Sequence, residues 1–310
     1  MNLKFLETFI WVARLRSFSL AAEKLHSTQA AISSRISVLE RDLGSKLFKR
    51  DPKGVTLTRE GERVLRHAEQ VSQSMTQLYE ALQGEQFAYG TIRIGAMDSA
   101  IHSWFVDFVA DVMAHYPNLD IEVTSETALN LNEQLRRGML DMVIQTDMLR
   151  DETIRSVEVL ELSVGWIAAV NSPVAGPWAH DTPTSALRRL GNERLITYSR
   201  HSRPHQDLLR LMQSYGISET RVSCVNSVAA MIQLTQAGFG VAAMPPALVP
   251  TPLEKGTLRQ LEGLEVPPPL PFVIAWRTGT DWTERLVEIA IETVRKYAAR
   301  LGEDAARVVV

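Results

Sequence analysis

The chain has 310 residues, more than one typical domain, with 45% hydrophobic residues, 22% charged residues and a net charge of −3. This composition is that of ordinary folded proteins, and it excludes an intrinsically disordered chain. The single cysteine, Cys224, excludes an intramolecular disulfide and a multi-cysteine zinc site, and no apolar run reaches the roughly 18 residues of a membrane span.

Charge is distributed unevenly along the chain. Residues 1–66 hold 13 Lys and Arg against 7 Asp and Glu, a balance of +6, which leaves −9 for the remainder. This asymmetry predicts that only the N-terminal part contacts a polyanion, although charge alone does not separate this interpretation from a chance fluctuation. The N-terminal stretch does not look like a secretory signal, so we expect a cytoplasmic protein.

The first 58 residues have the pattern of three helices followed by a hairpin. The expected helices cover residues 3–16, 20–26 and 28–43, and the expected strands are Leu47-Phe48 and 55–57. Ser19 is the predicted cap of the second helix, Ser27 or Thr28 that of the third, and Gly44 ends the third helix. The turn Asp51-Pro52-Lys53-Gly54 joins the strands, so residues 1–58 are predicted to be a winged helix-turn-helix domain.

Such a domain presents its third helix to the major groove of double-stranded DNA. Gln29 is able to pair with adenine, Ala30 to meet a thymine methyl group, and hydroxyl groups and the helix N-terminus to contact phosphates. The predicted DNA-binding residues are Ser27, Thr28, Gln29, Ala30, Ser33, Ser34 and Arg35 on the helix, with Lys49, Arg50 and Lys53 on the hairpin. The alternative is a small helical domain with solvated polar faces.

A long helix is expected over residues 59–89, with apolar positions spaced alternately by four and three residues. This narrow seam predicts self-association, and the alternative is a helix packed on its own domain. The predicted dimerisation residues are Val64, Ala68, Val71, Met75, Leu78 and Leu82.

From residue 91 the pattern changes to alternating strands and helices, which predicts an α/β fold with parallel strands and crossovers. The expected strands are 91–96, 120–125, 141–145, 157–161, 163–170, 194–198, 221–225, 240–244 and 272–276. The expected helices are 100–115, 129–138, 184–191, 204–215, 227–237 and 283–300. A returning last strand suggests two subdomains that the chain crosses twice, and residues 302–310 are expected to form a loose tail.

Ligands of such sheets bind at the carboxyl ends of strands, beside helix N-termini. The residues predicted to line this cleft are Asp98, Ser99, Ala100, Thr146, Asp147, Tyr198, Arg200, His201, Asn226 and Ser227. Asp98 would oppose an anion and favour an amine or hydroxyl group. Asp98 and Asp147 have the alternative role of helix caps, and Arg200 and His201 that of solvated side chains.

Other motifs favour structural roles. Trp104, Phe105 and Phe108 are expected in the core or in a subunit interface rather than around a ligand. His201 and His205 have the spacing of metal ligands, but Pro204 interrupts the helix that would align them. The usual phosphate-loop, zinc-protease, nucleophile-elbow and dinucleotide patterns are absent from the sequence. We therefore predict no catalytic residues, no metal site and no resident cofactor.

Residues 1–88 resemble the DNA-binding head and linker helix of the LysR-type transcriptional regulators. The residues that carry the resemblance are Leu3, Phe9, Val12-Ala13, Ser17-Phe18-Ser19, Ala21-Ala22, Leu25, Thr28-Gln29, Ala31, Ser33, Ile36, Leu39-Glu40, Leu43-Gly44, Leu47-Phe48, Arg50, Leu57-Thr58 and Gly61. Thr28 replaces a common serine, Ala30 stands where proline is frequent, and Ser34-Arg35 differs from the usual pair. YPNLDIEV, LRRGMLDMVI and LTQAGFGVAAMPPAL resemble segments of the family's effector domain.

The resemblance implies a two-lobed effector-binding domain similar to periplasmic binding proteins over residues 90–301. Lobe one would comprise residues 91–164 plus 266–300, and lobe two residues 165–265. It also implies an unidentified small-molecule effector between the lobes, a homodimer or homotetramer paired through linker helices, and contact with RNA polymerase. The expected function is that of a sequence-specific, effector-modulated regulator. The alternative is a small-molecule-binding protein or an enzyme built on the same α/β body.

Overall fold

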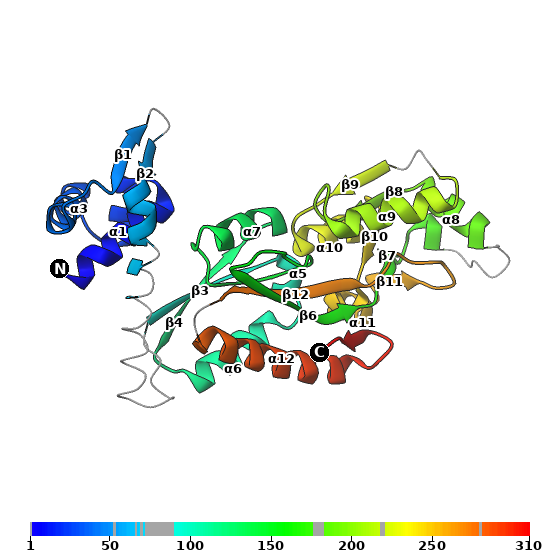
Figure 1. The fold of residues 1–310 in the computed structure, drawn as a ribbon. Coiled ribbons are helices and arrows are strands. Elements are labelled where there is room, and N and C mark those ends of the chain that lie inside the picture. The colour runs from blue at the N-terminus through cyan, green and yellow to red at the C-terminus, as the bar shows by residue number, and fades with distance from the viewer. Residues whose placement is uncertain are drawn as a thin grey trace. The chain divides into compact units, whose positions relative to one another are not determined.

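The structure is a computed structural model (Figure 1), and it describes residues 2–51, 54–65, 67–68, 71, 90–175, 183–217, 221–278 and 281–310. The chain divides into two compact units. One holds Met1–Thr91 with the short segments Tyr116–Asp120 and Arg137–Met139, and the other holds the rest. We call residues 2–71 the head and residues 90–310 the body, and describe each by itself.

The head consists of three helices and a two-stranded hairpin, as the sequence predicts. Its elements are α1 (Leu3–Leu15), α2 (Phe18–Lys24), α3 (Gln29–Leu43), β1 (Phe48–Asp51) and β2 (Gly54–Leu57). Thr28 caps α3 by accepting a hydrogen bond from the Ala31 N–H at 3.2 Å, and Gly44 ends it with φ +67°.

The expected cap of α2 is wrong. Ser17, not Ser19, accepts the hydrogen bond from the Leu20 N–H, and α2 begins at Phe18. Either serine of Ser17-Phe18-Ser19 has the chemistry of a cap, and the sequence does not choose between them. Phe18 packs edge-on against Phe48 at 5.8 Å between ring centres, which fits a helix start two residues earlier than expected.

One apolar core joins all elements of the head. Phe9, Ile32, Leu39 and Leu47 are fully buried in it. Residues 59–65, 67–68 and 71 are helical, and this helix starts at Thr58, whose Oγ1 accepts a hydrogen bond from the Gly61 N–H at 2.9 Å. The first turns of the linker helix therefore pack on the head itself.

The body contains two mixed sheets. The first has the order β13-β6-β12-β5-β3-β4. Its strands are β3 (Gly90–Ala96), β4 (Leu119–Ser125), β5 (Met142–Gln145), β6 (Ile154–Leu162), β12 (Leu270–Arg277) and β13 (Ala306–Val308). Figure 1 shows α6 (Phe105–His115) and α12 (Asp281–Leu301) side by side along one face, with α7 (Ala128–Arg136) on the other. The short helix α5 (Asp98–Ile101) follows β3.

The second sheet has the order β11-β7-β10-β8-β9. Its strands are β7 (Gly165–Ala169), β8 (Arg194–Thr197), β9 (Arg221–Cys224), β10 (Val241–Met244) and β11 (Leu258–Leu261). The helical segments that accompany it are η1 (Pro173–Ala175), α8 (Pro183–Gly191), α9 (Arg203–Ser214), α10 (Val228–Gln236), η2 (Pro246–Leu248) and α11 (Pro250–Glu254). Trp166, Ala168, Val241 and Ala243 pack with side chains of α8 and α9. Because side chains alternate along a strand, α10 covers the opposite face.

The chain passes from the first sheet to the second between β6 and β7, and returns between β11 and β12. We call the layers built on the two sheets lobe one and lobe two. Every strand of lobe two comes from one continuous stretch of sequence, whereas lobe one combines strands from both sides of that stretch.

Several expectations for the body are wrong in detail. The sheets are not all parallel, because β12 is antiparallel to both β5 and β6, and β7 is antiparallel to β10. The expected helix 100–115 is split into α5 and α6, and the Ser103 hydroxyl donates to the carbonyl oxygens of Ser99 and Ala100 at the break. The strand β11 and the helix α11 were not predicted.

The tail is not loose throughout. Residues Ala306–Val308 form β13, which pairs antiparallel with β6 and covers the edge of the first sheet. The Ser163 side chain reinforces this pairing by donating to the Asp304 carbonyl oxygen at 2.7 Å. Within the described part of the chain, no helix has the length and apolar character needed to cross a bilayer.

Candidate functional site

The first candidate site is the exposed face of α3. Thr28, Gln29, Ala30, Ser33 and Ser34 are all exposed, while Ile32, Ile36 and Leu39 on the opposite side are buried in the head's core. The helix therefore presents small and polar groups, together with its N-terminal N–H groups, to a partner. Side chains of this size let a backbone approach closely, as a helix in a major groove must.

Gln29 is oriented by a neighbouring helix. The Ser19 hydroxyl of α2 donates to Gln29 Oε1 at 3.2 Å. The amide nitrogen of Gln29 can still donate, and the oxygen can still accept a second hydrogen bond. Ser19 thus has a role at this surface rather than the capping role expected for it.

The remaining predicted DNA-binding residues differ in exposure. Arg35 is partly buried and its Nη1 donates to Thr8 Oγ1 at 3.3 Å, so it ties α3 to α1. Ser27 is partly buried, and Lys49 on the hairpin is exposed. Lys53 and the side chain of Arg50 lie outside the described residues.

Glu40 couples α3 to the hairpin. One carboxylate oxygen accepts the N–H groups of Leu47 at 2.9 Å and Phe48 at 3.3 Å, and the other lies 2.6 Å from Lys46 Nζ. Burial raises the pKa of Glu40, but hydrogen bonds from Lys46 and the two backbone N–H groups outweigh it, and the net pKa lies below its ordinary value. A charged, buried carboxylate therefore holds the hairpin in position beside the recognition helix.

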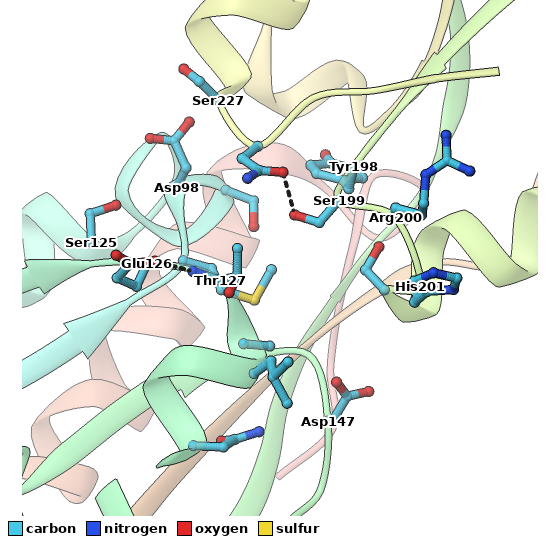
Figure 2. A pocket seen from close by; sticks show the side chains of 17 residues that line it. Asp98, Ser125, Glu126, Thr127, Asp147, Tyr198, Ser199, Arg200, His201 and Ser227 are labelled. Carbon is cyan, nitrogen blue, oxygen red and sulfur yellow. Dashed lines mark hydrogen bonds between the residues drawn. The ribbon is translucent and has the colours of Figure 1, made fainter. Parts of the chain in front are cut away.

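The second candidate site is a cavity of about 620 Å³ within the body, at the ends of strands from both lobes (Figure 2). The structure brings most of the predicted cleft residues together around it. Those that line the cavity are Asp98, Ser99, Asp147, Tyr198, Arg200, His201, Asn226 and Ser227. Ala100 and Thr146 are buried next to it and are not part of its lining.

Sequence reasoning missed the segment that follows β4. The lining residues that were not predicted are Met97, Ser125, Glu126, Thr127, Ala128, Leu129, Asn132, Ser199 and Ser202. The signal was present, because Ser125 ends a strand and Thr127 precedes a helix, as at the sites that were predicted. Glu126 stiffens this loop, since its Oε2 accepts hydrogen bonds from the Asn130 amide at 3.0 Å and the Thr127 N–H at 3.3 Å.

Three buried polar atoms in the cavity lining have no hydrogen-bond partner among the described residues: Ser99 Oγ, Tyr198 OH and Asn132 Oδ1. Ser99 is 2% exposed and Tyr198 is 5% exposed. Burial, and secondarily the negative charge of Asp98, raises the pKa of Tyr198, so its hydroxyl group remains a hydrogen-bond donor. An unpartnered buried polar group costs about 1–3 kcal/mol, and a ligand that supplies the partner recovers that energy.

Charged groups surround these polar atoms. Asp147 lies on lobe one, and Arg200 and His201 lie on lobe two (Figure 2). Both basic side chains are exposed, and His201 has φ +67°, a conformation that residues other than glycine rarely adopt. The cavity is thus able to bind a small polar molecule that carries charges of either sign.

Asp98 connects the two lobes. It stands in the first turn of α5, yet its Oδ2 accepts a hydrogen bond from the N–H of Val228, the first residue of α10. His102 Nδ1 lies 3.5 Å from the same oxygen. Asp98 is therefore a cap, as one of the alternatives proposed, but the helix that it caps belongs to the other lobe.

The other motifs have structural roles. The rings of Trp104, Phe108 and Phe272 are buried together in lobe one. His205 Nδ1 accepts the His201 N–H at 3.2 Å, and the described part of the chain contains no cluster of three metal-binding side chains. Burial raises the pKa of the partly buried Cys224 thiol, which disfavours the reactive thiolate.

The predicted seam of the linker helix is only partly described. Ala68 is buried in the head's core and Val64 packs against that core, whereas Val71 is exposed. Met75, Leu78 and Leu82 lie outside the described residues.

Two known protein-family domains match this chain, and their descriptions agree with the two candidate sites. Residues 86–298 match the family described as "LysR substrate binding domain", and residues 3–62 match "Bacterial regulatory helix-turn-helix protein, lysR family". The chain belongs to the LysR family. It is a DNA-binding transcriptional regulator with a helix-turn-helix head and an effector-binding domain.

Individual relatives agree with this assignment. The regulator MetR of Salmonella typhimurium is 29% identical over 247 residues, which cover 79% of this chain and 75% of MetR. Full-length OxyR from Pseudomonas aeruginosa has the same fold, with a TM-score of 0.67, 19% identity and coverage of 96% and 99% of the two chains. LysG from Corynebacterium glutamicum, determined with the effector arginine bound, has a TM-score of 0.62, 19% identity and the same coverage.

Proposed function

We propose that this LysR-family chain binds specific DNA sites in the cytoplasm as a homo-oligomer. The contact would be made by the exposed face of α3, which begins at Gln29. The exposed hydroxyl and amide groups of this face support direct contacts with bases and phosphates. The excess of basic residues in the first 66 positions supports an electrostatic contribution from phosphates. The hairpin, tied to α3 through Glu40, would contact the DNA backbone beside the helix.

The effector site that we propose is the cavity between the lobes. The observation that carries this proposal is the convergence of the unpartnered Ser99 Oγ, Tyr198 OH and Asn132 Oδ1 on one cavity. A molecule of the size of an amino acid, with hydroxyl, amine or carboxylate groups, would supply those partners. The arginine bound to LysG is an effector of this kind in a protein of the same fold.

The two sites would communicate through the lobes. An effector that binds one arrangement of the lobes more tightly than another shifts the population towards the first. In a homodimer or homotetramer joined through linker helices, such a shift would change the spacing of the heads and thereby the DNA contacts. Contact with RNA polymerase would convert this change into altered transcription.

The DNA-binding proposal is tested by fluorescence anisotropy with operator fragments obtained from genome-wide binding-site mapping. Gln29→Ala should cost about 1–3 kcal/mol and relax selection at one base position. Glu7→Ala, an exposed acidic position on α1, is the control and should bind no more weakly than the unchanged chain. If Gln29→Ala left both the affinity for DNA and the selection of sites intact, α3 would not recognise DNA in the way we propose.

The effector proposal is tested by a thermal-shift screen of small amino acids, carboxylic acids and amines. A compound that stabilises the unchanged chain should lose most of its effect in Ser99→Ala and Tyr198→Phe, because each removes one hydroxyl group from the cavity. A chain that bound such compounds but showed no salt-dependent DNA binding would instead be a small-molecule-binding protein, and turnover of the compound would indicate an enzyme.

A further inference from the structure

The carboxylate of Asp98, which lobe one carries, lies at the N-terminus of α10 in lobe two. It accepts from the first N–H of α10, where the helix presents partial positive charge and a backbone donor that has no partner within the helix. Ser227, the N-cap residue of α10, accepts from the Ala230 N–H as a cap ordinarily does, and Asp98 accepts from the Val228 N–H.

Two further donors lie in the same cavity. Ser99 and Tyr198 line the cavity, and their hydroxyl groups are buried and lack partners among the residues that the structure describes. A carboxylate has room for about four hydrogen bonds. These hydroxyl groups and the start of α10 therefore form a set of donors suited to a carboxylate, of which Asp98 engages the helix.

We propose that Asp98 is a built-in latch: its carboxylate, carried by lobe one, fills the anion position of lobe two and holds the lobes together until the carboxylate of an effector displaces it. The inference rests on the proposed effector site and narrows its ligand to compounds with a carboxylate group. It reverses the expectation that Asp98 would repel anions and select an amine. Asp98 binds the helix itself, and an incoming anion takes its place.

The latch connects binding to movement. Asp98 is attached to lobe one, so its contact with α10 links the lobes, whereas a free carboxylate at the same N–H contacts lobe two without that tether. Displacement therefore weakens a connection between the lobes. Asp147 differs from Asp98: among the described residues, its carboxylate accepts a hydrogen bond only from the Thr146 hydroxyl group, at 3.4 Å and on the same lobe.

The test measures the distance between the lobes by pulsed electron spin resonance. Spin labels are placed at Glu288→Cys on α12 and at Lys255→Cys after α11, both at exposed positions, in full-length chain carrying Cys224→Ser. The labelled protein is diluted with unlabelled chain, so that only distances within one chain contribute. Asp98→Ala should broaden the distribution and shift its mean by more than about 2 Å. Asp147→Ala, the matched control in the same cavity, should leave it unchanged.

Asp98→Asn keeps the size of the side chain without its charge, and it remains informative if the alanine variant folds poorly. It should broaden the distribution less than Asp98→Ala does. An unchanged distribution in both Asp98 variants would overturn the latch.

Acetate serves as the carboxylate probe, with chloride at equal ionic strength as the control. Acetate should move the distance distribution of the labelled chain that retains Asp98 towards that of the Asp98→Ala variant, and chloride should not. If the Asp98 variants moved the lobes but acetate did not, the competition with a carboxylate would be wrong. None of these measurements involves DNA, so a failure of the latch is distinguishable from a failure of the proposed regulation.

Discussion

At the scale of single residues, buried charged and polar groups show where this protein couples its parts. Glu40 is 8% exposed, yet it is charged and satisfied by two backbone N–H groups and Lys46. A partly buried carboxylate has a similar place in the body, where Asp98 of lobe one accepts a hydrogen bond from α10 of lobe two. In both places a single carboxylate fixes the relative position of two elements.

Replacing Glu40 should destabilise the head. Glu40→Ala leaves the Leu47 and Phe48 N–H groups without their acceptor, at a cost of about 1–3 kcal/mol in urea unfolding. Because the folded-state pKa lies below the ordinary value of 4.5, the carboxylate's contribution is complete above about pH 4.5 and is lost as the pH falls below it. Glu40→Gln should therefore differ from the unchanged chain more at pH 7 than at pH 3.5. Glu7→Ala, exposed on α1, should change stability little at either pH.

His205 should make the body sensitive to acid. It is buried, and its pKa is lowered by burial and then by the positive charges of Arg200 and His201. The neutral ring accepts the His201 N–H, so its stabilising contribution is complete above about pH 6.5, the ordinary value, and is lost as the pH falls through the lower folded-state value. His205→Asn retains an acceptor and does not titrate. Melting temperatures between pH 7.5 and 5 should fall less steeply for this variant, and an identical slope would contradict the assignment.

At the scale of elements, the sequence predicted most helices and strands because their signals are local. Thr28 and Gly44 delimit α3 by their own chemistry, and the apolar runs of β5, β7 and β10 could only be buried. The missed elements depend on the tertiary structure. The strand β13 forms by pairing with the edge of β6, and no local pattern near Ala306 indicates that pairing.

Part of the cavity lining was predictable from the sequence, as were most helices and strands. A rule about strand ends located Asp98, Asp147, Tyr198 and Ser227, because it needs only the order of elements. The partner of Asp98 is 130 positions away in sequence, so no local pattern could reveal that it caps α10. The hydrogen bond from Arg35 to Thr8, 27 positions earlier, likewise has no local signal in the sequence.

Close packing of the linker helix on the hairpin gives a prediction at this scale. A Cβ atom at Gly61 would lie 2.2 Å from the Leu47 carbonyl oxygen and 3.0 Å from Leu57 Cδ2. The carbonyl belongs to the backbone and cannot move aside, so Gly61→Ala should cost about 1–3 kcal/mol. Glu62→Ala, the exposed next position, should stay within about 0.5 kcal/mol by the same chemical denaturation. Equal stability of the two variants would show that the helix can shift to accommodate a methyl group.

At the scale of the whole molecule, we infer that the apolar seam has two roles along its length, packing on the head and pairing with a second chain. Val64 and Ala68 pack with the head's own core, and Val71 is the first of the predicted positions that is exposed. We infer that pairing between chains begins near Val71 and continues through the positions predicted from the heptad spacing.

Met75→Asp should therefore weaken self-association without unfolding the head. Burying a charge in a paired helical seam is costly, and we expect the dimer dissociation constant to rise at least about tenfold by analytical ultracentrifugation. Gln73→Asp, two positions earlier and off the seam, adds the same charge and should have little effect. A Met75→Asp chain that remained as strongly associated as the Gln73→Asp chain would exclude the seam as the principal contact.

The interrupted topology of the body sets an order of assembly during translation. All five strands of lobe two lie between Gly165 and Leu261, so that lobe can complete its sheet while the ribosome still holds the following residues. Lobe one must wait for β12 and β13, which are synthesised last. During synthesis, lobe two can therefore be complete while lobe one of the same chain still lacks two strands. We therefore expect the lobe-one side of the cavity to be complete only after β12, which lies between β6 and β5, has been synthesised.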